Sequence, residues 1–223
     1  MPLIDPAGDN PASCRKKNIP RPLDYLSKGC ELLINMKTRC RWAEADPLST
    51  LYHDTEWGVP QHDDHILFEH LILDGLQAGL SWSIILKKRE YLRSAFDNFD
   101  PFVIASYGAA KIDELLTDKG VIRNRAKIEA VVKNAHAFHN IREKYKGFDN
   151  YIWQFVNGKS IRNGWKKQAE IPAQTKESIA MSIDLKKRGF KFVGPVICYA
   201  FMQAVGMVND HTVGCFRYHA VQQ

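Results

Sequence analysis

The stretch Gly189-Phe-Lys-Phe-Val-Gly-Pro195 is a short turn with a glycine near each end. Helical patterns adjoin it on both sides, over residues 175–188 and 195–206. Pro195 fits the first turn of the second helix, where its missing N–H has no intrahelical partner. Glycine permits a positive φ, and the backbone N–H groups at a helix N-terminus can bind a phosphate. The stretch is therefore a candidate helix-hairpin-helix motif, and an ordinary αα-hairpin explains it at least as well.

Positive charge surrounds this turn, from Lys186, Lys187, Arg188 and Lys191. In a helix-hairpin-helix motif these cations would clamp the backbone of one DNA strand, with Lys191 and Gly194 as contacts. In an ordinary hairpin they would favour a helix C-terminus. A second basic cluster, formed by Arg123, Arg125 and Lys127, also has two interpretations: it is either a further phosphate contact or a solvated face.

Helical periodicity extends outward from the turn as far as Asp63. It is clearest over 124–144, where apolar residues recur at helical spacing: Ile128, Val131, Val132, Ala135 and Phe138. Further helices are predicted over 63–74, 81–97, 110–118 and 148–156, and Ser81 is a natural N-cap for the second of these. No segment shows convincing strand-like alternation. We therefore predict an all-α domain over residues 38–218, without internal repeats, followed by a tail at 219–223.

Residues 1–37 are predicted to be a flexible extension. They hold half of the prolines of the chain and little apolar periodicity. Their charges nearly balance, so a basic DNA-binding arm is a minor alternative. Another alternative is that Met36 is the true start.

The composition of the 223-residue chain narrows the class of protein. Hydrophobic residues make up 45% and charged residues 25%, the proportions of an ordinary globular protein, which excludes a collagen, a coiled coil and a disordered chain. No stretch reaches the roughly 18–20 consecutive apolar residues of a membrane span. The net charge of +6 makes a polyanionic partner plausible. The five cysteines do not form a disulfide framework and no cleavable signal peptide is evident, so we expect a cytoplasmic protein with no membrane partner.

Two pairs of possible metal ligands stand near the two ends of the predicted domain. Cys40 and His53 have twelve residues between them, and His211 and Cys215 are four apart. Two residues four apart on a helix project from one face, so the second pair can share a tetrahedral ion with the first. A Cys2His2 zinc site is one interpretation; satisfied histidines and small buried cysteines are the other. A closed site of this kind would be structural, joining the N- and C-terminal parts of the domain.

Aromatic residues concentrate in the first half of the domain, at Trp42, Tyr52, Trp57 and Trp82. Flat aromatic walls with a buried carboxylate suit a flat, electron-poor ring such as an alkylated nucleobase. Taken singly, each aromatic residue is better explained as part of the core. Asp74 is harder to explain in that way, because it lies in an apolar helix, where a carboxylate needs a partner or a task.

Seven blocks of the sequence together resemble one family of enzymes. They are Cys40-x-Trp42, Asp46-Pro-Leu48, Tyr52-His-Asp-x-Glu-Trp-Gly58, Gln77-Ala-Gly-Leu-Ser-Trp82, Leu86-Lys-Lys-Arg-Glu90, Lys187-Arg-Gly-Phe-Lys-Phe-Val-Gly194 and Asn209-Asp-His-x-Val-Gly-Cys215. In this order and spacing they resemble 3-methyladenine DNA glycosylase I, a family of the helix-hairpin-helix superfamily, over residues 38–217. The resemblance implies the DNA glycosylase fold and an enzyme of base-excision repair.

The activity implied by the resemblance is hydrolysis of the N-glycosidic bond of 3-methyladenine, with 3-methylguanine as a further substrate, in alkylated double-stranded DNA. The products are a free base and an abasic site, and the enzyme is expected to act as a monomer. One structural Zn²⁺ is implied, with Cys40, His53, His211 and Cys215 as ligands. Trp42, Tyr52, Trp57 and Trp82 are expected around the flipped base, Asp74 is the implied catalytic and base-reading carboxylate, and Gly79 and Leu80 belong to the implied wedge in the duplex.

Three positions depart from the pattern of this family. Asp74 stands where the base-reading carboxylate is usually Glu, Ser49 where a tyrosine is frequent, and Arg41 where a smaller residue is common. The shorter carboxylate reaches roughly 1.5 Å less far, which can turn a direct hydrogen bond into a water-mediated one. A noncatalytic, zinc-containing protein that binds damaged DNA is therefore the alternative hypothesis. Asp210, which precedes the implied ligand His211, is interpreted as structural.

Overall fold

The computed structural model describes residues 37–221, so the predicted extension over 1–37 lies outside the described residues except for Lys37. The elements below all belong to the unit that begins at Thr38. Its α-helices are α2 (Pro47–Thr55), α3 (Asp64–Gln77), α4 (Trp82–Ala95), α5 (Pro101–Ala105), α6 (Ala109–Thr117), α7 (Arg125–Tyr145), α8 (Phe148–Ile152), α9 (Lys176–Lys187), α10 (Pro195–Ala204) and α11 (Arg217–Ala220). Short 3-10 helices lie at η1 (Arg41–Glu44), η2 (Asp97–Phe99), η3 (Trp153–Val156) and η4 (Gln168–Glu170). The predicted all-α class is confirmed.

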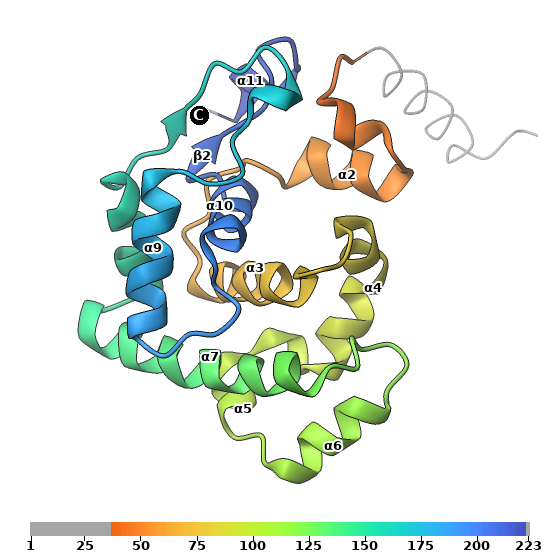
Figure 1. The fold of residues 1–223 in the computed structure, drawn as a ribbon, viewed down its shortest axis with the longest axis vertical. Helices are drawn as coiled ribbons and strands as arrows, with labels where there is room; N and C mark the ends of the chain where they lie inside the picture. The colour runs from red at the N-terminus through yellow and green to blue at the C-terminus, as the bar shows by residue number, and fades with distance from the viewer. Residues whose placement is uncertain (1–36, 222–223) are drawn as a thin grey trace, which may run out of the picture. The chain divides into compact units, whose positions relative to one another are not determined.

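Helix α3 forms the centre of the core, between α10 and α7 (Figure 1). Every residue from Leu67 to Leu76 is buried, including the polar residues in that range. A helix that is apolar on all sides is stable only when other elements cover it, and α4 and α8 also pack against α3. Asp74 is therefore carried into the interior by the helix on which it lies.

Helices α9 and α10 form the hairpin predicted around residues 189–195 and pack against each other. Gly189 has φ +97°, in the left-handed region that glycine tolerates, and Phe190 and Val193 of the turn are buried. The side chain of Asn134 on α7 binds the backbone of the turn at Lys191. It accepts a hydrogen bond from the Lys191 N–H at 2.7 Å and donates one to the Lys191 carbonyl at 3.1 Å. The conformation of the hairpin is thus fixed by its own core residues and by α7.

Two helices that the apolar pattern did not reveal, α2 and α5, each begin with an Asp-Pro pair. Asp46 caps α2 by accepting hydrogen bonds from two backbone N–H groups of its first turn, and Asp100 does the same for α5. Ser81 is the N-cap residue of α4, as predicted, but its side chain makes no capping hydrogen bond. Its hydroxyl lies 3.2 Å from that of Ser83 instead.

Helix α3 continues past the predicted end at residue 74 to Gln77, because a lysine from α7 satisfies carbonyls at its C-terminus. The Nζ atom of Lys127 donates to the carbonyls of Leu76 and Ala78 at 2.7 and 2.6 Å. The predicted helix over 148–156 divides into α8 and η3. The extension of α3 depends on a contact with α7 that local periodicity does not describe.

A two-stranded parallel sheet, β1 (Ile161–Arg162) and β2 (Val208–Asn209), joins the segment before α9 to the segment after α10. Strands of two residues are too short to show alternation, which explains why no strand was predicted. Helix α11 crosses residue 218, at which we placed the end of the domain, and Val221 is buried. Among the described helices, none combines the length and the apolar character of a membrane span.

Candidate functional site

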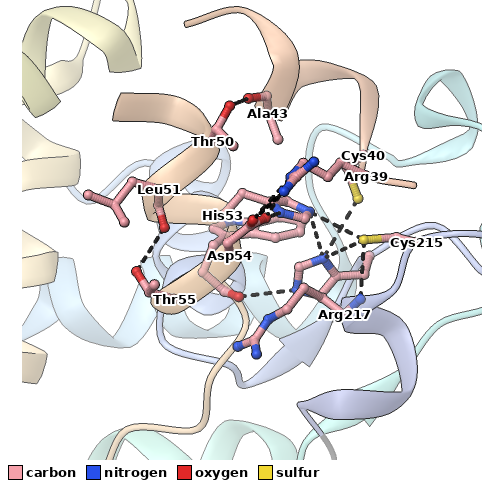
Figure 2. Close-up of polar contacts among 12 residues, drawn as sticks. Arg39, Cys40, Ala43, Thr50, Leu51, His53, Asp54, Thr55, Cys215 and Arg217 are labelled. Atoms are coloured by element: carbon pink, nitrogen blue, oxygen red, sulfur yellow. Dashed lines mark hydrogen bonds and ion pairs between the residues drawn. The ribbon is translucent and has the colours of Figure 1, made fainter. Parts of the chain in front are cut away.

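Four possible metal ligands, predicted as two distant pairs, meet in the structure. Cys40 precedes η1, His53 lies on α2, and His211 and Cys215 follow β2. All four residues are buried, and their ligand atoms lie within 4.8 Å of one another. Figure 2 shows the sulfur atoms of Cys40 and Cys215 and the ring of His53 converging on one point. This cluster could hold a metal ion.

Four of the six distances between ligand atoms in the cluster match those around a tetrahedral ion. With the usual zinc bond lengths of about 2.3 Å to sulfur and 2.0–2.1 Å to nitrogen, a tetrahedron has S···N edges of about 3.6 Å and an N···N edge of about 3.3 Å. His211 Nδ1 lies 3.7 Å from the Cys40 sulfur, 3.6 Å from the Cys215 sulfur and 3.2 Å from His53 Nε2. The Cys215 sulfur lies 3.4 Å from His53 Nε2. The donor set therefore fits the group that it was predicted to bind.

The second nitrogen of each imidazole has a fixed partner. His53 Nδ1 lies 2.8 Å from the carboxylate of Asp54, which also pairs with Arg39, and His211 Nε2 lies 3.1 Å from the carbonyl of Trp57. Such partners hold the tautomer that leaves the other nitrogen free for a metal. The arrangement orients both rings toward the cluster.

The two sulfur atoms accept hydrogen bonds from the backbone: Cys40 from the N–H of Thr212 and Cys215 from the N–H of Arg217, both at 3.4 Å. A hydrogen bond from Cys40, with contacts from the two imidazoles, holds the pKa of the Cys215 thiol far below its ordinary value, and the same interaction raises the pKa of Cys40. The thiolate form is the one that binds metal. One detail of the prediction is wrong: His211 and Cys215 lie in a turn rather than on a helix, and it is this turn that brings them together.

Beside the cluster lies a cavity of about 440 Å³. Its walls include all five residues expected around a flipped base: Trp42, Tyr52, Trp57, Asp74 and Trp82. The volume lies in the range typical of small-molecule sites. The cavity is joined to the metal cluster through Trp57, whose ring centroid lies 4.6 Å from that of His211 in an edge-on arrangement.

The aromatic side chains form one edge-to-face pair and one tilted pair at the cavity. The ring centroids of Trp42 and Trp57 are 5.0 Å apart, and those of Tyr52 and Trp82 are 5.3 Å apart. These separations are typical of favourable aromatic contacts, which hold each ring in place. The cavity is therefore walled by fixed flat surfaces.

Three buried polar atoms of the cavity wall have no hydrogen-bond partner in the described part of the chain: Asp74 Oδ2, the Tyr52 hydroxyl and Trp82 Nε1. Asp74 is only 3% exposed. Burial raises the pKa of its carboxyl well above the ordinary value, because the low-polarity surroundings disfavour the charged form. Unpaired buried polar groups are costly, and three of the five found among the described residues line this cavity, the other two being His70 Nδ1 and Arg217 Nε.

Sequence reasoning missed two walls of this cavity. One is a face of α10, formed by Val196, Tyr199, Ala200, Gln203 and Ala204, and the other is the segment at Gln168 and 171–173 before α9. The spacing of the α10 residues is helical and could have indicated a common face, but no sequence signal tells which neighbour that face meets. Ser49 is not part of the lining; it is buried and its hydroxyl donates to Asp46, the cap of α2.

The predicted DNA contacts lie at two turns that flank the cavity-lining elements. Gly79 is exposed, has φ +77° and follows the cavity residue Gln77 by two positions, with Leu80 next to it. Lys191 is exposed in the α9–α10 turn, and Gly194 is the N-cap of α10 without a side-chain cap. These four residues are not part of the cavity lining.

Comparisons with known proteins give one consistent result. The family model for methyladenine glycosylase matches residues 42–218. DNA-3-methyladenine glycosylase 1 of Escherichia coli K12 is 48% identical over 81% of this chain and 96% of its own length, and DNA-3-methyladenine glycosylase of Haemophilus influenzae Rd is 48% identical over 81% and 97%. A structure of 3-methyladenine DNA glycosylase I from Staphylococcus aureus, solved for its recognition of 3-methyladenine, superposes with a TM-score of 0.78 at 36% identity, over 80% of this chain and 95% of that one. The chain belongs to the methyladenine glycosylase family.

Proposed function

We propose that this protein releases 3-methyladenine from alkylated DNA by hydrolysis of the N-glycosidic bond. The observation that carries the proposal is the aromatic cavity with the unpartnered carboxyl of Asp74 in its wall. A purine that enters the cavity gains contact with flat rings, and its exocyclic amine can donate to Asp74. The relatives named above act on or bind the same base, which supports the choice of substrate.

The chemistry required of the protein is modest. An N3-methylated adenine carries positive charge in DNA, so its glycosidic bond is already weak and the departing base is neutral. Aromatic faces attract a cationic ring, and a carboxylate formed on Asp74 would stabilise it further. The protein extracts the nucleotide, holds the base and excludes bases that present other groups. Water then attacks C1′ of the deoxyribose, leaving an abasic site.

We assign the duplex contacts to the two turns beside the cavity. Gly79 and Leu80 would fill the gap left by the flipped nucleotide, since this turn is exposed and directly follows α3. Lys191 and Gly194 would contact a phosphate through a side-chain cation and the N-terminus of α10. A monomer is sufficient for this geometry, because a single chain supplies both turns and the cavity.

We infer that the ion of the Cys2His2 cluster is Zn²⁺. Two thiolates and two imidazoles in a tetrahedron are a usual zinc donor set, and four of the distances between the ligand atoms support it. Four protein ligands leave no coordination position for water, so the ion is structural and joins the two ends of the domain. Its contribution to the site is to hold Trp57 and α2 against the cavity.

A single-turnover assay tests the activity. Methylated duplex DNA that contains 3-methyladenine, 3-methylguanine and 7-methylguanine is incubated with excess protein, and the free bases are separated and counted. We expect release of 3-methyladenine far above its spontaneous rate, with little 7-methylguanine. Tight binding of the lesion without release would support the noncatalytic alternative, which the short carboxylate of Asp74 motivates.

Variants of Asp74 connect the activity to the cavity. Asp74→Ala should lower base release, while the zinc content and the affinity for undamaged DNA stay unchanged. Asp74→Glu, which restores the longer side chain common in the family, should keep or increase release. The matched control is Asp113→Asn, which changes an exposed carboxylate paired with Arg125, away from the cavity. Equal release by wild type and Asp74→Ala would remove Asp74 from the mechanism.

A further inference from the structure

Asp210 is a buried carboxylate whose two oxygen atoms each accept two hydrogen bonds. It lies between β2 and the metal ligand His211 and is 1% exposed. Oδ1 accepts hydrogen bonds from Asn163 Nδ2 at 2.6 Å and Trp165 Nε1 at 2.7 Å. Oδ2 accepts from the Tyr199 hydroxyl at 2.6 Å and Gln203 Nε2 at 2.7 Å. Four donors saturate a carboxylate, so Asp210 fixes the positions of other groups.

One of these groups is the amide of Gln203, which lines the cavity. Because Nε2 donates to Asp210, the orientation of the amide is set, and Oε1 remains as its acceptor. No donor to Oε1 is found among the residues that the structure describes. Tyr199 also lines the cavity, but its hydroxyl is already engaged by Asp210. The α10 wall of the cavity therefore offers an acceptor and no competing donor from these two side chains.

The position of Gln203 favours contact with the base over contact with the DNA backbone. It lies nine residues, about two and a half helical turns, from Gly194, which caps the hairpin end of α10. Its backbone carbonyl accepts a hydrogen bond from the N–H of Gly58, the residue after Trp57. Gln203 is thus placed at the Trp57 end of the cavity, away from the turn that would contact a phosphate.

We propose that Gln203 is a specificity-determining residue, whose Oε1, oriented by Asp210, accepts a hydrogen bond from the exocyclic amine of the flipped base. The proposal rests on the proposed function, since it concerns the same cavity. It assigns Asp210 the role of a positioning residue that acts through Gln203. It also gives a physical reason for a saturated carboxylate beside a metal ligand.

The test uses free bases, so that binding is separated from catalysis. Binding of 3-methyladenine and of its N6,N6-dimethyl derivative, which has no amine N–H, is followed by quenching of the tryptophan fluorescence of the full-length, zinc-loaded protein. Gln203→Met keeps the length of the side chain and removes the acceptor. We expect the preference for 3-methyladenine over the dimethyl derivative to fall roughly 3- to 10-fold, the effect of one hydrogen bond.

Asp210→Asn provides a second variant with Gln203 intact. The indole of Trp165 can only donate, so the oxygen of Asn must remain on that side and its NH2 group must face Gln203. The Gln203 amide would then turn and bring a donor to the cavity, which should produce a similar loss of preference. In the Gln203→Met background, Asp210→Asn should change the preference no further.

Trp165→Phe is the matched control. It removes one donor to Asp210 on the side away from Gln203, so it should lower the melting temperature and leave the preference unchanged. An unchanged preference in Gln203→Met overturns the inference, even where Asp210→Asn does not fold. A wild-type protein that neither binds nor releases 3-methyladenine would instead overturn the proposed function, and this inference with it.

Discussion

Removal of the ion from the Cys2His2 cluster should destabilise the domain by about 5 kcal/mol. The cluster joins Cys40 to Cys215, so a bound ion closes a loop of about 175 residues. The chain-entropy relation for a cross-link gives about 5 kcal/mol at 25 °C for a loop of that length. The free energy of unfolding of a typical domain is about 5–15 kcal/mol, so the ion contributes a large share of the stability. For a domain of this size it corresponds to a fall in melting temperature of about 10–20 °C.

Thermal unfolding followed by circular dichroism would measure this effect before and after dialysis against a chelator, and again after zinc is restored. Metal content is determined by mass spectrometry on the same samples. Cys215→Ala should bind less zinc and show little further response to the chelator. Cys198→Ala is the control, because Cys198 is equally buried but its sulfur contacts the Val193 carbonyl outside the cluster; it should respond to the chelator like the wild type. A metal-free protein that melts within about 3 °C of the loaded form would refute the reasoning.

Three further predictions concern stability. Burial raises the pKa of Asp74, so the folded state holds a proton that the unfolded state releases. The free energy of unfolding should therefore decline as the pH rises from the ordinary carboxyl pKa through the raised one. Asp74→Asn cannot titrate, so in urea unfolding its stability should exceed that of the wild type by a larger margin at pH 8.5 than at pH 5, and a constant margin would contradict this. Lys127→Met leaves the Leu76 and Ala78 carbonyls without their donor and should cost about 2–4 kcal/mol in denaturant titrations, whereas a loss below about 1 kcal/mol would show that the end of α3 needs no cap. Gly206→Ala brings a Cβ within 2.4 Å of the Pro60 nitrogen at φ +71° and should lower the melting temperature far more than Gly108→Ala, which meets no atom within 4 Å; equal effects would contradict the steric argument.

Much of the helical framework was predictable from local pattern. The apolar stripe of α7 and the glycine-bounded turn before Pro195 are short-range signals, because helix periodicity and turn conformation depend on residues a few positions apart. The four metal ligands and the aromatic residues with Asp74 were also named from residue type and order, with the resemblance to a known family deciding between the alternatives. Helices α2 and α5 carried a local signal too, an Asp-Pro pair, which a search for apolar stripes overlooks.

The sequence by itself determined most of the helices, the residues that carry chemistry and the family, since each of these depends on the pattern of residue types over a few neighbouring positions. Only the tertiary structure decided which groups meet: that His211 and Cys215 converge through a turn, that Lys127 extends α3, and that Gln203 turns its acceptor away from Asp210. Lys127 and Leu76 are 51 residues apart, and the turn of His211 and Cys215 meets Cys40 and His53 from the other end of the domain. Such contacts form only when packing around α3 offsets the entropy of bringing the segments together. The cavity is a product of that packing, because its walls come from elements that share no local pattern.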